Sequence, residues 1–203
     1  MKIAIIGSGI EAFCCGHRLL DLDPDLDLHV FDEKAESGMF GEEPGLFEKW
    51  PLMPGPWVGE MYSQTPTQQF SAVRYSWLVK SISISLARRG TTLHLKSKVN
   101  NIENNNVEFS GAGVLGNGKI GFNKVIDFRK GKTGIKWQGG ILNNAIEVEI
   151  CGTRPDNTIE VWWQGEDIEA NFIQRMEWHG INPTKALSER VFLGIETAEL
   201  SII

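Results

Sequence analysis

The first twenty residues, MKIAIIGSGIEAFCCGHRLL, constrain the fold more than any other stretch of the chain. A short apolar run over residues 3–6 predicts a buried strand, and the pattern after the glycines predicts a helix to about residue 22. The motif between them reads Gly7-Ser8-Gly9-Ile10-Glu11-Ala12, which is GxGxxA. Gly7 permits a tight turn, Gly9 lets the backbone approach a pyrophosphate, and the small Ala12 lets the helix pack on the strand. We therefore predict a dinucleotide site at the start of this helix, where free N–H groups and the helix dipole attract phosphate.

The following segment completes a strand–helix–strand unit. LHVFDE, residues 28–33, predicts a second strand that ends near Asp32, about twenty residues after the glycines. A carboxylate at this position accepts hydrogen bonds from a ribose diol and repels a 2′-phosphate, which favours FAD or NAD over NADP. Ser8 and Glu11 are candidates for phosphate or ribose contact by position. The alternative is a tight glycine turn that holds no ligand.

In the rest of the chain, the sequence pattern predicts a second helix followed by mostly antiparallel strands. Residues 37–70 form a long loop rich in Gly, Pro and aromatic residues, whose aromatic content argues against disorder. Helices are predicted over 71–89 and 166–178, and strands over 91–99, 107–110, 118–128, 145–151 and 158–164. Residues 190–200 predict a strand that runs into a short turn or helix. This order predicts an α/β fold, a Rossmann-like FAD/NAD(P)-binding domain with a small, reduced β-rich substrate region.

We expect one domain over residues 1–203. Its nucleotide-binding core would comprise about 1–102, 123–128 and 190–203, and its reduced substrate side about 103–122 and 135–180. Because the strand 158–164 alternates, adjacent Trp162 and Trp163 must point to opposite faces.

The net charge and the cysteines limit the classes of partner and site that the chain is expected to have. The net charge of −6 disfavours nucleic acid and anionic membranes as partners. Cys14, Cys15 and Cys151 have neither CxxC nor metal-ligand spacing, so we predict reduced thiols and no metal site. No stretch reaches a membrane-spanning length, and we expect a cytoplasmic protein.

Five stretches together resemble a family of FAD-binding enzymes. They are IAIIGSGIEAFCCGHRL, LHVFDEKAESGM, SAVRYSWLVKSISISLARRGTTLHLKSKVNNIE, GFNKVIDFR and RVFLGIETA. The family includes glutathione reductase, flavin aromatic hydroxylases, lycopene cyclases and amine oxidases. The resemblance implies FAD as the cofactor, with NAD as the weaker alternative and NADPH as a possible reductant.

The resemblance also places further residues at the cofactor. They are Glu33, Lys34, Gly38, Met39, Arg74, Val99, Gly194 and Glu196. Arg74, which precedes a helix, would contact the flavin nucleotide, and the backbone at Val99 would lie near the adenine. Glu196 would contact the ribityl chain or phosphate.

Three functions are compatible with these patterns. The first is a small FAD-dependent oxidoreductase, monooxygenase-like or NAD(P)H-linked, acting on a small apolar or aromatic molecule. The second is a dinucleotide-binding module without catalysis, completed by a partner subunit or a homodimer. The third is a non-redox flavoenzyme similar to lycopene cyclases.

Catalytic residues are not assigned, because a flavin carries its own redox chemistry. The histidines are interpreted as structural, and His179 as a residue that caps the end of the predicted helix 166–178. A basic run also stands out: Arg129, Lys130, Lys132 and Lys136. We interpret it as a solvated loop, with attraction of an anionic substrate or NADPH phosphate as the alternative.

Overall fold

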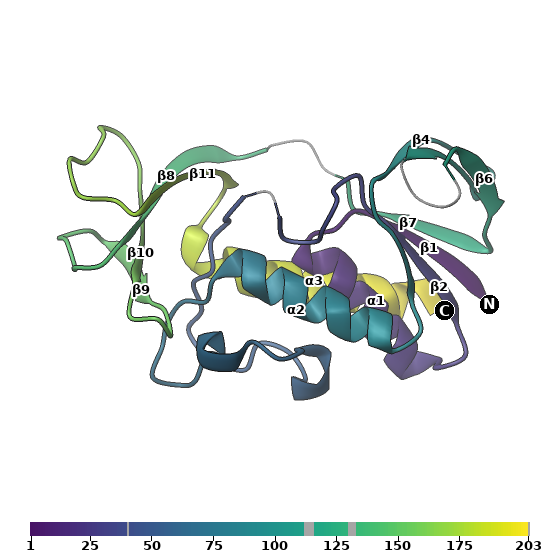
Figure 1. Cartoon of the computed structure of the whole chain (residues 1–203), viewed down its shortest axis with the longest axis horizontal. Helices are drawn as coiled ribbons and strands as arrows, with labels where there is room; N and C mark the ends of the chain where they lie inside the picture. The colour runs from purple at the N-terminus through teal and green to yellow at the C-terminus, as the bar shows by residue number, and fades with distance from the viewer. Residues whose placement is uncertain (40, 112–115, 130–132, 203) are drawn as a thin grey trace.

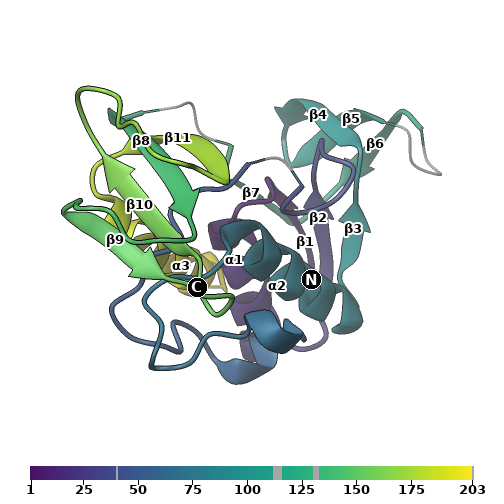
Figure 2. The ribbon, with the colours of Figure 1, turned by 60° about the vertical axis from the view of Figure 1, so that its left-hand side comes forward.

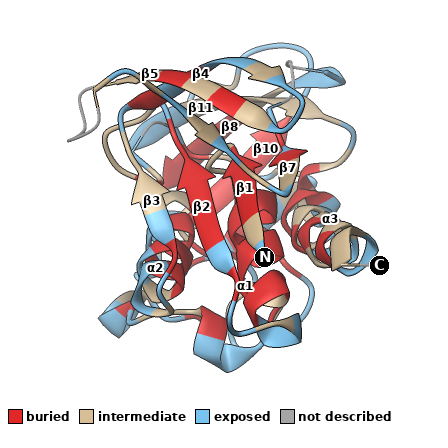
Figure 3. Cartoon of the chain, turned by 90° about the vertical axis from the view of Figure 1, so that its right-hand side faces the viewer, coloured by how far each residue is buried: buried red, intermediate tan, exposed pale blue. Residues whose placement is uncertain are grey.

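The computed structural model describes residues 1–39, 41–111, 116–129 and 133–202. Its centre is a four-stranded parallel sheet in the order β3 (Thr92–His94), β2 (Asp27–Phe31), β1 (Lys2–Ile6), β7 (Lys124–Asp127). The two central strands are apolar and buried along most of their length (Figure 3). The predicted strand–helix–strand unit is confirmed, with parallel pairing of β1 and β2.

Three helices cover one face of this sheet (Figure 1). They are α1 (Ile10–Leu22), α2 (Tyr75–Arg88) and α3 (Pro183–Ile202). Ile3 and Ile5 of β1 point into the core that they share with these helices. A Cβ on Gly194 of α3 would overlap the backbone oxygen of Glu11, so α1 and α3 pack backbone against backbone.

An antiparallel three-stranded sheet covers the other face (Figure 2). Its strands are β4 (Ser97–Glu103), β5 (Asn106–Gly111) and β6 (Gly118–Gly121). Ala4 and Ile6 point to this side, where they join a core with Val107 and Phe109. The predicted strand 91–99 is divided between β3 and β4, and 118–128 between β6 and β7.

The second half of the chain adds a separate antiparallel sheet, seen on the left of Figure 1. Its order is β11 (Gln174–Gly180), β8 (Ile135–Leu142), β10 (Ile159–Trp163), β9 (Ile150–Thr153). Trp162 packs with Leu46 and Ala72 on one face, whereas Trp163 packs with Leu142 on the other. The prediction that these tryptophans face opposite ways is confirmed.

The loop between β2 and α2 packs against the helices. It contains two short 3-10 helices, η1 (Gly55–Trp57) and η2 (Tyr62–Gln64). Trp57 is buried, and its Nε1 donates to Asp21 Oδ2 of α1 at 2.9 Å. His17 of α1 stacks on the same indole, with ring centroids 5.4 Å apart. The packing of Trp57 agrees with the expectation that the aromatic residues of this loop keep it ordered.

Two predicted elements are wrong. The helix expected over 166–178 is replaced by β11 from Gln174, because Met176 and Trp178 pack against Trp162 in the antiparallel sheet. His179 therefore lies on a strand and not at a helix end. Strand β8, which pairs with both β10 and β11, was not expected from the sequence.

The strand expected at the start of 190–200 is also wrong, because the whole segment lies inside α3. The helix begins with Pro183 in its first turn, after Asn182. Asn182 Oδ1 accepts hydrogen bonds from the Thr184 backbone N–H at 2.9 Å and from Thr184 Oγ1 at 2.8 Å. The buried residues then recur at helical spacing: Ala186, Leu187, Val191, Gly194 and Ala198.

Candidate dinucleotide-binding site

A cleft of about 620 Å³ lies at the carboxyl ends of the parallel strands β1 and β2. The glycine turn, the first turn of α1 and residues of β11 line it. In open α/β sheets, ligands bind outside the carboxyl ends of the strands. The location therefore agrees with the site predicted from the opening motif.

The glycine turn has the backbone that its residues predict. Gly7 adopts a φ of +119°, which disfavours residues with a side chain, and its N–H donates to Phe31 O at 3.0 Å. Gly9 caps α1, and its carbonyl accepts the N–H of Ala12 at 3.1 Å. The first turn of α1 thus directs N–H groups that lack intrahelical acceptors toward the cleft, with the positive end of the helix dipole behind them.

Asp32 provides a buried acceptor in the same cleft. The residue is 3% exposed, and its Oδ1 accepts the Lys34 backbone N–H at 2.9 Å. Its Oδ2 has no hydrogen-bond partner among the residues described. Burial raises the pKa of this carboxyl, and hydrogen bonding to the carboxylate from the Lys34 backbone and the Ser8 side chain opposes the shift. Because buried polar atoms are nearly always paired, Oδ2 suits a ligand hydroxyl such as that of a ribose.

A cation that the sequence did not reveal lies at the glycine turn. Arg190 of α3 donates from Nε to Glu11 Oε2 at 2.8 Å and also forms an ion pair with Glu43. Its Cζ lies 5.4 Å from the centre of the Tyr75 ring. Arg190 was missed because the segment that it begins was predicted to start as a strand. The cap signal of Asn182-Pro183 is the pattern that could have identified the helix.

Nine of the predicted site residues line the cleft: Gly7, Ser8, Gly9, Glu11, Asp32, Glu33, Lys34, Gly38 and Val99. Gly38, at a φ of +79°, also approaches the backbone oxygen of Ser76 so closely that a Cβ would overlap it. The structure therefore brings the glycine turn and the end of β2 together as predicted.

Six other predicted residues are absent from the cleft lining that the structure describes: Ile10, Ala12, Met39, Arg74, Gly194 and Glu196. Ala12 is buried against the sheet, as its packing role requires, and Glu196 is exposed on α3. Arg74 turns to Glu42, with Nε 3.3 Å from Oε1, and its Cζ lies 5.5 Å from the Trp77 ring. Arg190, and not Arg74, is the arginine that lines the cleft beside the glycine turn.

Basic residues also line the cleft. Lys34, Lys98 and Arg129 all line it. Arg129 donates from Nη1 to the Val99 carbonyl at 2.9 Å and pairs with Asp127 at 2.6 Å. Lys136, from the same basic run, pairs with Glu177 at 2.6 Å. The predictions for Lys130 and Lys132 fall outside the residues that the structure describes.

Trp178 and His179 of β11 also line the cleft. The sequence prediction placed Trp178 in a helix and His179 at its end, so their position in the lining of this cleft was not expected. The antiparallel sheet thus contributes residues of β11 to a cleft that the parallel sheet, its helices and the start of β4 also line.

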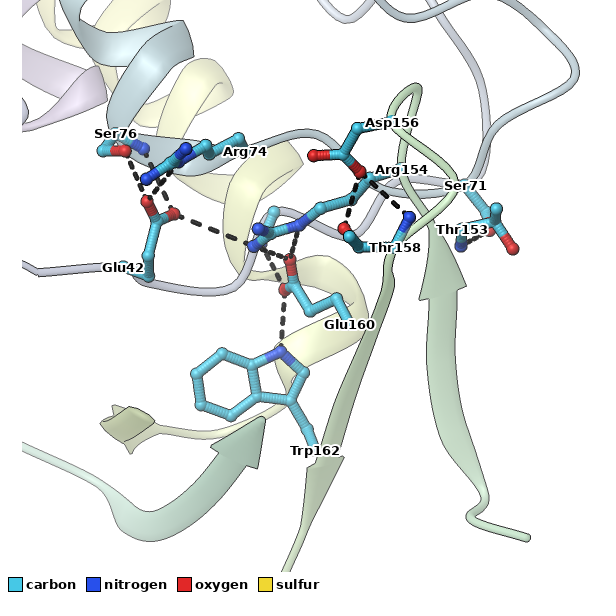
Figure 4. A network of polar contacts seen from close by, with 11 residues as sticks. Glu42, Ser71, Arg74, Ser76, Thr153, Arg154, Asp156, Thr158, Glu160 and Trp162 are labelled. Atoms are coloured by element: carbon cyan, nitrogen blue, oxygen red, sulfur yellow. Dashed lines mark hydrogen bonds and ion pairs between the residues drawn. The ribbon is translucent and has the colours of Figure 1, made fainter. Parts of the chain in front are cut away.

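A buried ionic network fixes the antiparallel sheet to the nucleotide-binding half (Figure 4). Glu160, which is 0% exposed, accepts Arg154 Nη2 at 2.6 Å, Trp162 Nε1 at 2.8 Å and the Gly45 N–H at 2.8 Å. Arg154 Nη2 also lies 3.7 Å from Glu42 Oε2, and Glu42 binds the start of α2. These contacts fix where β11 stands relative to the cleft.

No protein-family model matches the chain, and no curated protein does either. Solved structures share its shape. A flavoprotein/dehydrogenase from Cytophaga hutchinsonii has a TM-score of 0.62 at 10% identity, over 100% of this chain and 78% of that protein. CabE, an aromatic hydroxylase from angucycline biosynthesis, has a TM-score of 0.59 at 12% identity, over 88% of this chain and 52% of CabE.

BexE, from a study of oxidation during BE-7585A biosynthesis, has a TM-score of 0.52 at 12% identity. This match covers 79% of this chain and 42% of BexE. The chain therefore spans about half, or less, of the length of CabE and BexE.

The chain has the Rossmann-like α/β fold that these oxidoreductases share. Within that fold, its cleft combines a glycine turn at a helix N-terminus with an unpaired buried carboxylate oxygen, which fit the pyrophosphate and ribose of a dinucleotide. In the described ranges, no helix combines the length and apolar character needed to cross a membrane.

Proposed function

We propose that the chain binds FAD in this cleft and acts as a small FAD-dependent oxidoreductase, with NAD(P)H as reductant and a small apolar or aromatic substrate. The observation that carries the proposal is Asp32 Oδ2, a buried oxygen without a partner among the described residues, in the same cleft as Gly9. The same fold occurs in a flavoprotein/dehydrogenase and in an aromatic hydroxylase, and this likeness supports the choice of flavin.

The residues divide the binding task along the cleft. Gly9 admits the pyrophosphate to the first turn of α1, and Asp32 accepts the ribose hydroxyls. The neighbouring Val99 backbone lies toward the adenine end. The bound flavin supplies hydride or oxygen chemistry, while this chain's residues bind it, orient it and exclude water.

Trp178 and His179 support the choice of substrate class. Both residues belong to β11 and line the cleft. An aromatic residue in the lining favours a flat apolar molecule, and the His179 imidazole can exchange a proton with it.

Two matched variants test the cofactor site. A Cβ on Gly9 would lie 2.6 Å from Glu11 Oε2 and 2.7 Å from Arg190 Nη2, both ends of flexible side chains. Gly9→Val should therefore keep the fold and abolish FAD binding, as measured by the visible spectrum and by release of bound dinucleotide. Asp32→Asn should weaken binding by about 1.5–3 kcal/mol, the value of hydrogen bonds to a charged group. Full affinity in both variants would refute the site.

A second candidate is a dinucleotide-binding module completed by a partner. The observation that favours it is the share of CabE that this chain spans, 52%. A protein that binds FAD but is reduced by neither NADH nor NADPH would support this alternative over the oxidoreductase.

A further inference from the structure

We infer that Arg190 is the anchor for the ligand's phosphates and that Glu43 regulates the site by competing for the same guanidinium. The inference rests on the proposed function, because it concerns the same cleft. It adds a residue that the opening motif does not contain and a regulatory contact from the loop that follows β2.

The position of Arg190 carries the first part. Its Nη2 lies 2.7 Å from the position that a Cβ on Gly9 would take, so it borders the backbone that admits a pyrophosphate. The Arg190 side chain is 23% exposed. Its position is set by α3, which packs closely against α1. A planar guanidinium matches the geometry of phosphate oxygens and binds two of them at once.

The charge around Gly9 shows why a cation is required there. Glu11 is 8% exposed and stands in the first turn of α1, so its carboxylate would repel a pyrophosphate. The bond from Arg190 Nε to Glu11 Oε2, at 2.8 Å, neutralises that carboxylate. The guanidinium therefore both cancels a repulsive charge and offers donors to the phosphate.

The cleft shows independently that a ligand belongs there. Asp32 is 3% exposed, lines the same cleft, and its Oδ2 has no partner within the described part of the chain. A ribose that satisfies Asp32 would carry its phosphates toward the N-terminus of α1, where Arg190 stands.

Glu43 carries the regulatory part. It reaches Arg190 Nη1 from the loop between β2 and α2, and its side chain is 37% exposed. Its neighbour Glu42 is bound to Ser76 at the start of α2, which anchors this part of the loop. A phosphate at the turn and the Glu43 carboxylate would share one guanidinium. The loop therefore lowers the affinity for phosphate-bearing ligands without contacting the ribose.

Binding of four ligands to the full chain tests both parts: FAD, ADP, adenosine and inorganic pyrophosphate, by calorimetry at low salt. Arg190→Gln should weaken ADP and FAD by about tenfold or more, as expected for loss of a charged hydrogen bond, and leave adenosine unchanged. Glu43→Gln should tighten ADP, and the gain should vanish in the Arg190→Gln/Glu43→Gln double variant.

Arg18→Gln is the matched control. Arg18 also joins α1 to α3, through Glu199 at 2.7 Å, but it lies outside the cleft lining of the described chain. It should change the stability of the α1–α3 contact and leave ADP affinity unchanged. An equal loss of ADP affinity in Arg18→Gln and Arg190→Gln would mean that Arg190 acts only through packing, and would overturn the inference.

The outcomes separate this inference from the proposed function. If the wild-type protein binds FAD and ADP but Arg190→Gln binds them equally well, the inference fails and the function stands. If pyrophosphate binding depends on Arg190 but FAD does not bind, the function fails and the anion site stands. If none of the phosphate-bearing ligands binds, both fail.

Discussion

The protonation of His17 gives a quantitative prediction for stability. His17 is 0% exposed, and its Nε2–H donates to Ile82 O at 3.1 Å. Its Nδ1 accepts from Arg89 Nη1 at 3.0 Å, so both ring nitrogens are used by the neutral form. Burial, chiefly, lowers the pKa of this imidazole from 6.5 to about 4.

The direction of the pH effect on stability follows from the difference between the folded and unfolded pKa values. The folded pKa lies below the unfolded one, so the unfolded chain binds more protons between about pH 6.5 and 4. Stability therefore falls as the pH falls through this window. From pH 7.5 to pH 5, the two pKa values give a loss of about 2 kcal/mol from His17 alone.

Urea unfolding of the wild type and of His17→Gln at pH 7.5 and pH 5.0 measures this contribution. Gln cannot be protonated, so the variant should lose about 2 kcal/mol less between the two pH values, whatever its stability at pH 7.5. His94, whose pKa is also lowered to about 4, is present in both proteins and cancels in the difference. An equal pH dependence in the two proteins would refute the reasoning.

Three further perturbations test the packing and the site. Gly194→Ala should destabilise the chain by about 1–3 kcal/mol in urea unfolding, because the new Cβ overlaps Glu11 O, whereas Glu196→Ala on the exposed side of α3 should stay within about 0.5 kcal/mol. Arg154→Met should lower the free energy of unfolding by about 3–5 kcal/mol, because it leaves Glu160 charged and buried. Adding Glu160→Gln to this variant should recover part of the loss. No recovery would mean that packing, and not the unpaired charge, dominates. Because burial raises the pKa of Asp32, dinucleotide affinity should fall on acidification at a higher pH than for an ordinary aspartate, and a flat titration in Asp32→Asn should confirm the source.

Local sequence determined the centre of the fold. A strand, a glycine turn and a helix form from neighbouring residues, and the positive φ of Gly7 is a property of one residue. Asp32 was predicted because a second parallel strand beside the first brings its end to the glycine turn. Alternation alone also placed Trp162 and Trp163 on opposite faces.

Tertiary structure decided the rest of the cleft. Arg190 and Glu11 are 179 residues apart, and they meet because Gly194 lets α3 approach α1. The apolar RVFLGIETAEL has residues common to strands and helices, so only the Asn182 cap and the packing against α1 select the helix. Trp178 and His179 reach the cleft because β8 and β10 hold β11 in an antiparallel sheet, and the long-range pairing that places them leaves no signal within one segment.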